Sequence, residues 1–154
     1  EAAVAVNARQ KTRLFRKASD RMITFQGLKV AVLGLAFKPG TDDLREAPSV
    51  DNVELLLAGG ADVYAYDPVA EYNFRKKYPE GNIGKGTMAY VESPEKALEG
   101  ANICFIFTEW KEIREIPARR YKELMKIPLV YDGRNVYGVD EMRKAGIEYY
   151  SIGR

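Results

Sequence analysis

The sequence lacks histidine and contains a single cysteine, Cys104, among its 154 residues. Zinc sites of the ordinary kind draw most of their ligands from these two residue types, so we expect no metal site. One cysteine cannot form a disulfide within the chain, and a chain without disulfides is typical of a reducing compartment. The simplest expectation is therefore a cytoplasmic protein.

Long apolar runs and an excess of one charge are also missing. No hydrophobic stretch approaches the roughly 18 residues needed to span a bilayer, and there is no signal-peptide pattern of charge, apolar core and cleavage site. The formal net charge is only +2, and the basic residues are interspersed with acidic ones. This distribution lacks the positive footprint of a general nucleic-acid-binding protein. We expect a soluble protein that binds neither membranes nor nucleic acid.

Short apolar runs alternate with helical patterns from Gly27 onward, which is the signature of repeated β-α-β units around a parallel sheet. The predicted strands are residues 29–35, 61–66, 89–92, 102–108, 128–132 and 147–151. The predicted helices are residues 48–58, 71–77, 93–99, 111–125 with an interruption at Pro117, and 139–145. The glycine-rich segment 81–86 is predicted as a loop. The sequence thus predicts an α/β fold, a Rossmann-like three-layer sandwich with a mostly parallel sheet of about six strands.

The first 26 residues contain no glycine or proline and are rich in alanine, arginine, lysine and glutamine. These are good helix formers, so a helix is predicted over residues 1–26. No capping residue precedes Glu1, and we therefore expect the chain to be part of a longer protein. We divide it into a helix from a central or linker region, residues 1–26, and a domain over residues 27–154.

The loop GLAFKPGTDDLRE, residues 34–46, directly follows the first predicted strand. In parallel α/β sheets, ligands bind beyond the carboxyl ends of the strands, where this loop lies. A dinucleotide fingerprint needs closely spaced glycines in the pattern GxGxxG, and only Gly34 and Gly40 are present. A P-loop needs its lysine directly after a glycine, whereas Lys38 precedes Gly40. A ligand at this loop must therefore be bound through side chains.

Four motifs carry a resemblance to a known family. The run Phe37-Lys-Pro-Gly-Thr-Asp-Asp-Leu-Arg45 resembles the FKxxTxDxR motif that opens the carboxy-terminal domain of the UDP-glucose/GDP-mannose dehydrogenase family. Further matches follow in the family's order: Tyr66-Asp-Pro68, Thr108-Glu-Trp110 and Asp132-Gly-Arg-Asn135. In addition, Val6-Asn7-Ala8-Arg9-Gln10 is similar to the VNxxQ stretch in the helix that leads out of the family's central domain. The resemblance covers essentially the whole chain.

The resemblance implies a fold and an activity. The family's enzymes join two Rossmann-like domains by a long helix and oxidise a sugar C6 alcohol twice, with NAD, to a carboxylate. By resemblance, residues 27–154 are the C-terminal nucleotide-sugar-binding domain of a UDP-glucose, or related nucleotide-sugar, 6-dehydrogenase. The implied ligand is a UDP-sugar, and the implied cofactor is NAD, bound mainly by the other Rossmann-like domain. The full-length protein is expected to be a homodimer or a larger oligomer.

The resemblance also implies an incomplete active site. The sequence contains neither the GxGxxG of the family's NAD domain nor the GGxC run that holds its catalytic thiol. Cys104 lies in the apolar stretch 103–107, where a cysteine is usually an inert small hydrophobe. We expect no catalytic residue in this chain and no activity of the chain alone.

Three residues are implied to contact the nucleotide sugar: Phe37, Lys38 and Arg134. An aromatic face suits a base or a sugar, and cationic side chains suit anionic oxygens. The alternatives are a phenylalanine folded onto the sheet edge, a solvated lysine and an arginine in a surface salt bridge. Arg45 resembles the family arginine that reaches across the domain cleft to NAD. The alternative for Arg45 is an ion pair with Asp42, Asp43 or Glu46, and both roles are compatible when no cofactor is bound.

Other motif residues are given structural roles. Thr41 and Asp43 are predicted to fix the loop through hydrogen bonds from side chain to backbone. Asp67 sits where a dinucleotide-binding acid would hold a ribose, but without the glycine fingerprint a turn-forming aspartate is the favoured interpretation. Trp110 is predicted to pack, and Glu109 to cap a helix or to pair locally.

Two other functions stay open from the sequence. A stand-alone nucleotide-binding or regulatory module would use the same domain without dehydrogenase activity. Autonomous NAD binding by the sheet is disfavoured by the incomplete fingerprint. The sequence leaves undecided whether the base is uracil or guanine and which sugar is attached.

Overall fold

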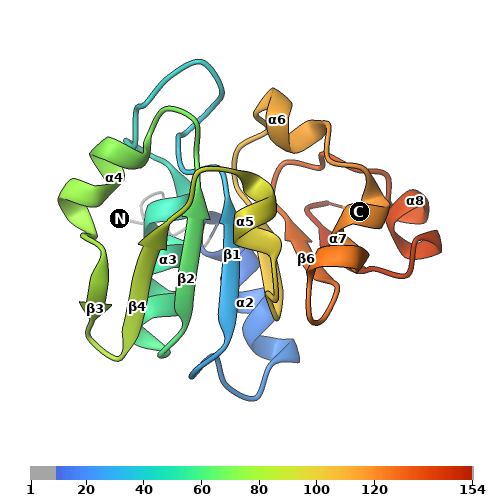
Figure 1. Ribbon diagram of the computed structural model, residues 1–154, viewed down its shortest axis with the longest axis horizontal. Helices are drawn as coiled ribbons and strands as arrows, with labels where there is room; N and C mark the ends of the chain where they lie inside the picture. The colour runs from blue at the N-terminus through green and yellow to red at the C-terminus, as the bar shows by residue number, and fades with distance from the viewer. Residues whose placement is uncertain (1–9, 154) are drawn as a thin grey trace.

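The computed structural model describes residues 10–153, which form a seven-stranded sheet between two layers of helices (Figure 1). The strands are β1 (Lys29–Leu33), β2 (Asp62–Tyr66), β3 (Gly81–Ile83), β4 (Gly86–Tyr90), β5 (Ile103–Ile106), β6 (Leu129–Asp132) and β7 (Glu148–Ser151). They lie in the order β3-β4-β2-β1-β5-β6-β7, and every neighbouring pair is parallel except β3 with β4. The predicted fold class is confirmed.

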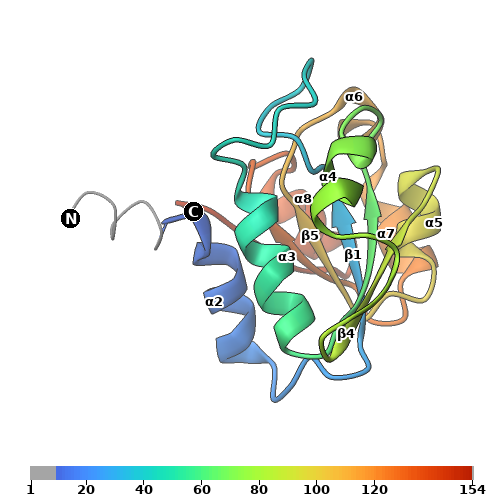
Figure 2. The same ribbon diagram turned by 90° about the vertical axis from the view of Figure 1, so that its left-hand side faces the viewer.

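The helices cover both faces of this sheet. They are α2 (Arg13–Arg21), α3 (Pro48–Ala58), α4 (Glu71–Lys77), α5 (Pro94–Leu98), α6 (Lys111–Arg114), α7 (Ala118–Leu124) and α8 (Val139–Lys144). Figure 2 shows α2 and α3 on one side of the sheet and α5 and α7 on the other. The predicted interruption at Pro117 is confirmed, because this residue separates α6 from α7.

Strand β1 shows why the sequence builds two cores. Its side chains alternate between faces: Val30 and Val32 belong to the core under α2, α3 and α4, whereas Ala31 and Leu33 belong to the core under the other helices. All four are fully buried. A strand covered on both faces reads as a continuous apolar run, and this is the pattern that predicted a central position for residues 29–35.

The predicted loop over residues 81–86 is wrong in part. Gly81–Ile83 forms the edge strand β3, which pairs antiparallel with β4 through Gly81 opposite Met88. Gly84, with a φ of 60°, lies in the turn between the two strands. This strand has one hydrophobic side chain, that of Ile83, which packs against the core under α2, α3 and α4. Three residues are too few to show hydrophobic alternation, so the sequence pattern gives no signal for the strand. The next strand also begins earlier than predicted, at Gly86.

The predicted helix over residues 1–26 is wrong at its C-terminal end. Residues 1–9 lie outside the described residues, and within the described part α2 ends at Arg21. Phe25 is buried and stacks on Phe15 with ring centroids 5.3 Å apart, which requires the chain to turn back onto α2. Gly27 completes this turn with a φ of 72°. Helix propensity was thus overridden by burial of one aromatic side chain.

Asn52 on α3 fastens α2 to the domain. Its side chain is fully buried, its Nδ2 donates to the carbonyl oxygen of Lys11 at 2.6 Å, and its Oδ1 accepts from the amide of Phe15 at 3.1 Å. An uninterrupted helix would join that amide directly to that carbonyl. The Asn52 carboxamide therefore stands in for one helical hydrogen bond and ties two elements together.

Asn52→Ala is expected to lower the free energy of unfolding by about 2–4 kcal/mol, because it empties a fully buried position and removes the partner of the part-buried Lys11 carbonyl and Phe15 amide. Urea denaturation followed by circular dichroism measures this loss. Asn73→Ala is a matched control, since Asn73 makes one surface hydrogen bond to Asp42, and its expected cost is below about 0.5 kcal/mol. Equal losses in the two variants would contradict the role of Asn52.

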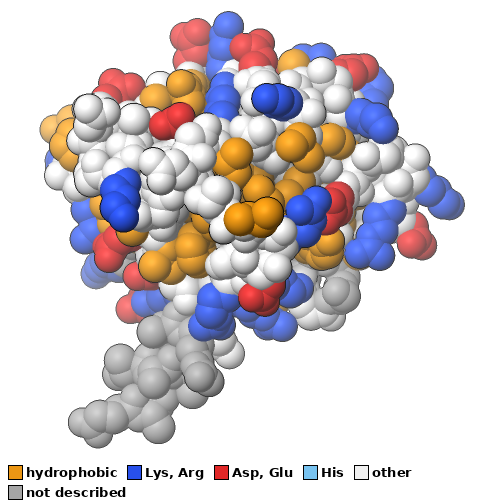
Figure 3. Space-filling view, turned by 90° about the horizontal axis from the view of Figure 1, so that it is seen from below, with side chains coloured by type: hydrophobic (Ala, Val, Ile, Leu, Met, Phe, Trp, Pro, Cys, Tyr) orange, Lys and Arg blue, Asp and Glu red, His pale blue; other side chains and the backbone are white. Residues whose placement is uncertain are grey.

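The edge of the sheet at which the parallel strands begin presents hydrophobic side chains between charged ones (Figure 3). Ile23, before β1, and Ile127, before β6, are exposed there. Within residues 10–153, no helix has the length and apolarity that crossing a membrane requires. The site residues predicted from the motifs all come from the opposite edge, where the parallel strands end.

Candidate functional site

The candidate site lies where the chain changes direction in the sheet. From β1 the chain proceeds to β2 on one side, and it later returns to β5 on the other side of β1. The loops that follow β1 and β5 therefore diverge, and such a point is where ligands bind in open α/β sheets. The loop after β1 is residues 34–47, and the loop after β5 is residues 107–110.

Gly34 starts the first loop in a position that no other residue fits. Its φ is 91°, and a Cβ built on it would lie 2.5 Å from both the Cβ and the backbone nitrogen of Thr108. Both the backbone conformation and the lack of space require glycine. The two loops are thus in direct contact at their bases, and the hydroxyl of Thr108 donates to the carbonyl of Ala36 at 2.6 Å.

Asp67, at the end of β2, joins three loops. Its side chain is buried, and its Oδ1 accepts from the amides of Val69 and Ala70, both at 2.8 Å. Its Oδ2 accepts from three donors, the amides of Leu35 and Ala36 and the indole Nε1 of Trp110, at 2.7, 3.0 and 2.9 Å. The predicted turn-forming role is confirmed by the first pair of bonds. The second set was not predicted.

These bonds leave the base of the first loop with no free backbone donor. The amides of Leu35 and Ala36 point at Asp67, and the hydroxyl of Ser49 donates to the carbonyl of Leu35 at 2.6 Å. In a dinucleotide fingerprint, backbone groups at this position approach the pyrophosphate. Here the amides of Leu35 and Ala36 donate to Asp67 instead, so a ligand at this loop can be bound only through side chains.

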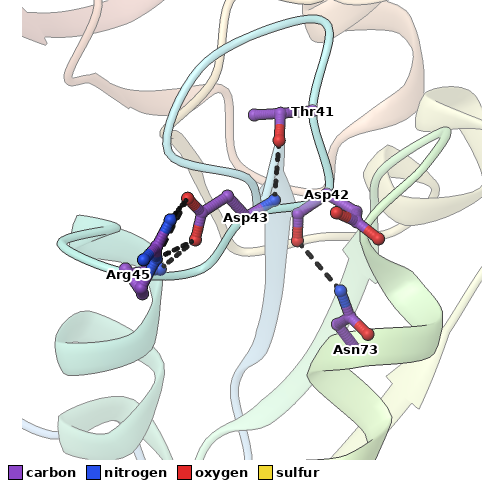
Figure 4. Close-up of polar contacts among 5 residues, drawn as sticks. All are labelled: Thr41, Asp42, Asp43, Arg45 and Asn73. Atoms are coloured by element: carbon purple, nitrogen blue, oxygen red, sulfur yellow. Dashed lines mark hydrogen bonds and ion pairs between the residues drawn. The ribbon is translucent and has the colours of Figure 1, made fainter.

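The outer part of the loop is held by short-range contacts (Figure 4). The amide of Asp43 donates to Thr41 Oγ1 at 3.1 Å, and the amide of Arg45 donates to Asp43 Oδ1 at 2.9 Å. The predicted loop-fixing roles of Thr41 and Asp43 are confirmed. Arg45 also forms an ion pair with Asp43 at 2.9 Å, although its side chain is 90% exposed. Hydrogen bonds from Arg45 lower the pKa of Asp43 below its ordinary value.

Phe37 and Lys38 lie at the exposed part of the same loop. Phe37 is 40% exposed, and its amide donates to the carbonyl of Asp43 at 2.9 Å, which closes the loop on itself. Lys38 is exposed. The structure therefore presents an aromatic face and an ammonium group at the edge where ligands bind in this class of sheet.

Arg134 follows β6 in a second rigid loop at the same edge. Asp132 is fully buried and accepts hydrogen bonds from the amides of Arg134 and Val136, at 2.9 and 2.7 Å, and from the hydroxyl of Tyr149 at 2.6 Å. Asn135 has a φ of 52° and exchanges two hydrogen bonds with the backbone of Ile152, at 3.0 and 3.1 Å. The loop backbone is thus fixed on both sides of Arg134.

The Arg134 guanidinium is paired with Glu109. Nε and Nη2 both donate to Glu109 Oε2, at 3.2 and 2.9 Å, and each side chain is about one-third exposed. Burial alone would raise the pKa of Glu109, but the hydrogen bonds from Arg134 and its positive charge contribute to an overall lowering of the pKa. The prediction that Glu109 caps a helix or pairs locally is wrong, because its partner lies on the neighbouring strand's loop.

Arg134 lines a small cavity of about 50 Å³. The other residues around it are Gln10, Lys11, Leu14, Pro48, Phe107, Gly133 and Ile152. The cavity lies between the start of α3, at Pro48, and the loop of Arg134. Lys38 is not one of its lining residues, so the structure brings Lys38 and Arg134 to one edge of the sheet but not into this cavity.

Cys104 is fully buried on β5, as predicted, and burial raises the pKa of its thiol. Within residues 10–153, no three histidine, cysteine or acidic side chains lie together as a metal site would require. Trp110 is partly buried and packs against both cores, in agreement with its predicted packing role, while its indole bond to Asp67 was not foreseen.

An open, mostly parallel sheet with side-chain donors at its direction-change point defines a Rossmann-like ligand-binding domain. Residues 31–139 match the UDP-glucose/GDP-mannose dehydrogenase family, UDP binding domain, and the chain belongs to this family.

Curated relatives and solved structures agree with this assignment. The chain is 41% identical over 151 residues to the UDP-glucose 6-dehydrogenase YwqF of Bacillus subtilis, covering 98% of this chain and 33% of that protein. It is 44% identical over 151 residues to the UDP-glucose 6-dehydrogenase of Pseudomonas aeruginosa, covering 97% and 33%. The structure of a UDP-glucose dehydrogenase from the archaeon Pyrobaculum islandicum superposes with a TM-score of 0.68 at 32% identity, covering 95% of this chain and 29% of that one. The chain thus spans about a third of the length of these relatives.

Proposed function

We propose that this chain is the C-terminal UDP-sugar-binding domain of an NAD-dependent UDP-glucose, or related nucleotide-sugar, 6-dehydrogenase that oxidises the sugar C6 alcohol to a carboxylate. The observation that carries the proposal is the match of residues 31–139 to a UDP binding domain, combined with cationic and aromatic side chains at the ligand edge of the sheet. In this function the chain contributes binding, and the chemistry depends on parts of the enzyme outside it.

Three side chains carry the proposed binding of the nucleotide sugar. The Lys38 ammonium and the Arg134 guanidinium neutralise anionic oxygens of the diphosphate, and the Arg134 fork adds directional hydrogen bonds. The half-exposed ring of Phe37 offers a face for the base or the sugar. Because the amides of Leu35 and Ala36 are held by Asp67, side chains supply the contacts that backbone donors supply in a glycine fingerprint.

NAD fits this chain only in part. The absence of free amides at residues 35 and 36 does not suit a dinucleotide cradle, which argues against autonomous NAD binding. Arg45 does suit a supporting role, because its guanidinium is 90% exposed and is paired only at the surface, with Asp43. We propose that Arg45 contributes a hydrogen bond or charge to NAD held mainly by another domain, where NAD would accept the hydride.

Thermal unfolding with added ligand tests the proposal. UDP at about 100 times its dissociation constant adds about 2.7 kcal/mol to the stability of a single-site protein, or a rise in Tm of roughly 5–10 °C for a chain of this size. We expect this shift with UDP and UDP-glucose, and a smaller shift in Lys38→Ala and Arg134→Ala. Lys126→Ala removes an exposed cation that precedes β6, at the edge where the parallel strands begin, and should keep the full shift.

Parallel titrations with GDP and NAD separate the alternatives. A shift with GDP equal to that with UDP would leave the base unselected, and saturable binding of NAD alone would favour the autonomous NAD-binding function. If neither UDP nor UDP-glucose shifted the Tm at millimolar concentration, nucleotide-sugar binding by this chain would be wrong. A stand-alone regulatory module is distinguished by the gene region encoding the chain, which would then lack an adjoining dehydrogenase domain.

A further inference from the structure

We infer that Glu109 is a positioning residue that holds the Arg134 guanidinium in its ligand-binding orientation. The inference rests on the proposed function, because it assigns to Glu109 a role through Arg134 and not through direct contact with the nucleotide sugar.

The first support is the rigidity of both partners. Glu109 follows Thr108, whose hydroxyl is bonded to Ala36, and the carbonyl of Glu109 accepts from Arg114 Nε at 3.2 Å. The backbone of Arg134 is fixed by Asp132 and by the neighbouring Asn135. β5 and β6 are adjacent and parallel, so their two loops start side by side. An ion pair between two fixed backbones restricts the arginine far more than a pair between mobile side chains would.

The second support is the way in which the guanidinium is used. Glu109 takes Nε and Nη2 on a single oxygen, Oε2, and leaves Nη1 outside the pair. A guanidinium presents five N–H donors, so several remain for a ligand while Glu109 stays bound. The pairing therefore orients Arg134 and leaves several of its N–H donors available to a ligand.

The third support is the other oxygen of Glu109. Oε1 is buried and has no hydrogen-bond partner among residues 10–153. In an ordinary surface ion pair, both carboxylate oxygens are hydrated, and such pairs contribute little to stability. Burying one oxygen of the Glu109 carboxylate does not stabilise the fold. The burial is better explained by the need to hold the Arg134 side chain in one orientation.

The positioning itself can be tested without ligand. In the ¹⁵N-labelled chain, the Nε–H of Arg134 should exchange slowly with solvent because it donates to Glu109. Glu109→Gln keeps an acceptor and should speed exchange moderately, whereas Glu109→Ala should speed it by about tenfold or more. Glu115→Gln is the matched control, since Glu115 pairs with exposed Lys111 on α6 and should leave Arg134 unchanged. Equal exchange in wild type and Glu109→Ala would overturn the inference.

The consequence for binding is tested by a double-mutant cycle with UDP as the probe. Glu109→Ala is expected to raise the dissociation constant by about threefold to fivefold, and Glu109→Gln by less, with the Tm of the free chain lowered by no more than about 2 °C. In an Arg134→Ala background, Glu109→Ala should have no further effect on UDP binding, because Glu109 acts through Arg134.

The outcomes separate this inference from the proposed function. If Arg134→Ala weakens UDP binding but Glu109→Ala leaves it unchanged or tightens it, the inference is wrong and the proposed function stands. Tighter binding would mean that the carboxylate competes with the anionic ligand. If Arg134→Ala leaves UDP binding unchanged, the proposed role of Arg134 is wrong, and the inference fails with it. An effect of Glu109→Ala that persists in the Arg134→Ala background would likewise overturn it.

Discussion

Asp67→Ala is expected to lower the free energy of unfolding by about 3–5 kcal/mol. The substitution removes the acceptor of five hydrogen bonds from a buried position and leaves the amides of Leu35, Ala36, Val69 and Ala70 and the Trp110 indole without it. A buried donor left without a partner costs about 1–3 kcal/mol, and the losses are not additive because water can enter the space. Urea denaturation followed by circular dichroism at 222 nm measures the change.

Two further variants identify the cause of this loss. Asp42→Ala removes an exposed acid from the neighbouring loop and should change stability by less than about 0.5 kcal/mol. Asp67→Asn keeps the size of the side chain but replaces one acceptor with an NH₂ group that would face hydrogen-bond donors, so it should also be strongly destabilising. If Asp67→Ala were no more harmful than Asp42→Ala, the joining role of Asp67 would be wrong.

Gly34→Ala is the second substitution with a large expected effect, again about 3–5 kcal/mol. Alanine at a φ of 91° is strained by itself, and its methyl carbon would lie 2.5 Å from the backbone nitrogen of Thr108. Because that neighbour is backbone next to β5, relief requires the loops after β1 and β5 to move apart. The variant should therefore unfold at lower urea concentration and should also weaken the proposed binding of UDP by the loop.

Gly40→Ala separates the cost of backbone strain at a positive φ from the cost of steric overlap at the Cβ. Gly40 has a similar φ of 86°, but a Cβ there would meet nothing within 4 Å. Its expected cost is only the conformational one, about 1–2 kcal/mol. The difference between the two variants thus measures the close approach of the loops at Gly34. Similar losses in the free energy of unfolding for Gly34→Ala and Gly40→Ala would show that the close contact between the two loops does not contribute to stability.

The parts of the fold that sequence patterns predicted are those in which local pattern and tertiary burial agree. The apolar run of β1, the helix from Pro48 to the paired glycines and the break at Pro117 all follow from side-chain periodicity and backbone chemistry. β3 was missed because a three-residue strand is too short to show hydrophobic alternation, and residues 22–26 were misassigned because the burial of Phe25 outweighed helix propensity.

The candidate site shows the same limit. The loop and the motif residues could be placed at the carboxyl edge because the position of a loop follows from the order of strands and helices. The partners of Asp67 and Glu109 could not be predicted, because they come from loops 31 to 43 residues away for Asp67 and 25 residues away for Glu109. Tyr66-Asp-Pro68 contains a turn signal, which revealed only the local half of the role of Asp67. The contacts of Phe37, Lys38, Arg45 and Arg134 with ligands stay predictions.

The buried carboxylate of Asp67 has a consequence for redesigning specificity. A glycine-rich dinucleotide motif cannot be grafted into residues 34–40 by loop substitutions alone, because the amides that would chelate phosphate are already committed to that carboxylate. Freeing the amides of Leu35 and Ala36 would remove hydrogen bonds through which Asp67 holds three loops together. A change of ligand selectivity at this edge therefore requires substitution of outward-facing side chains, with the backbone beneath them left unchanged.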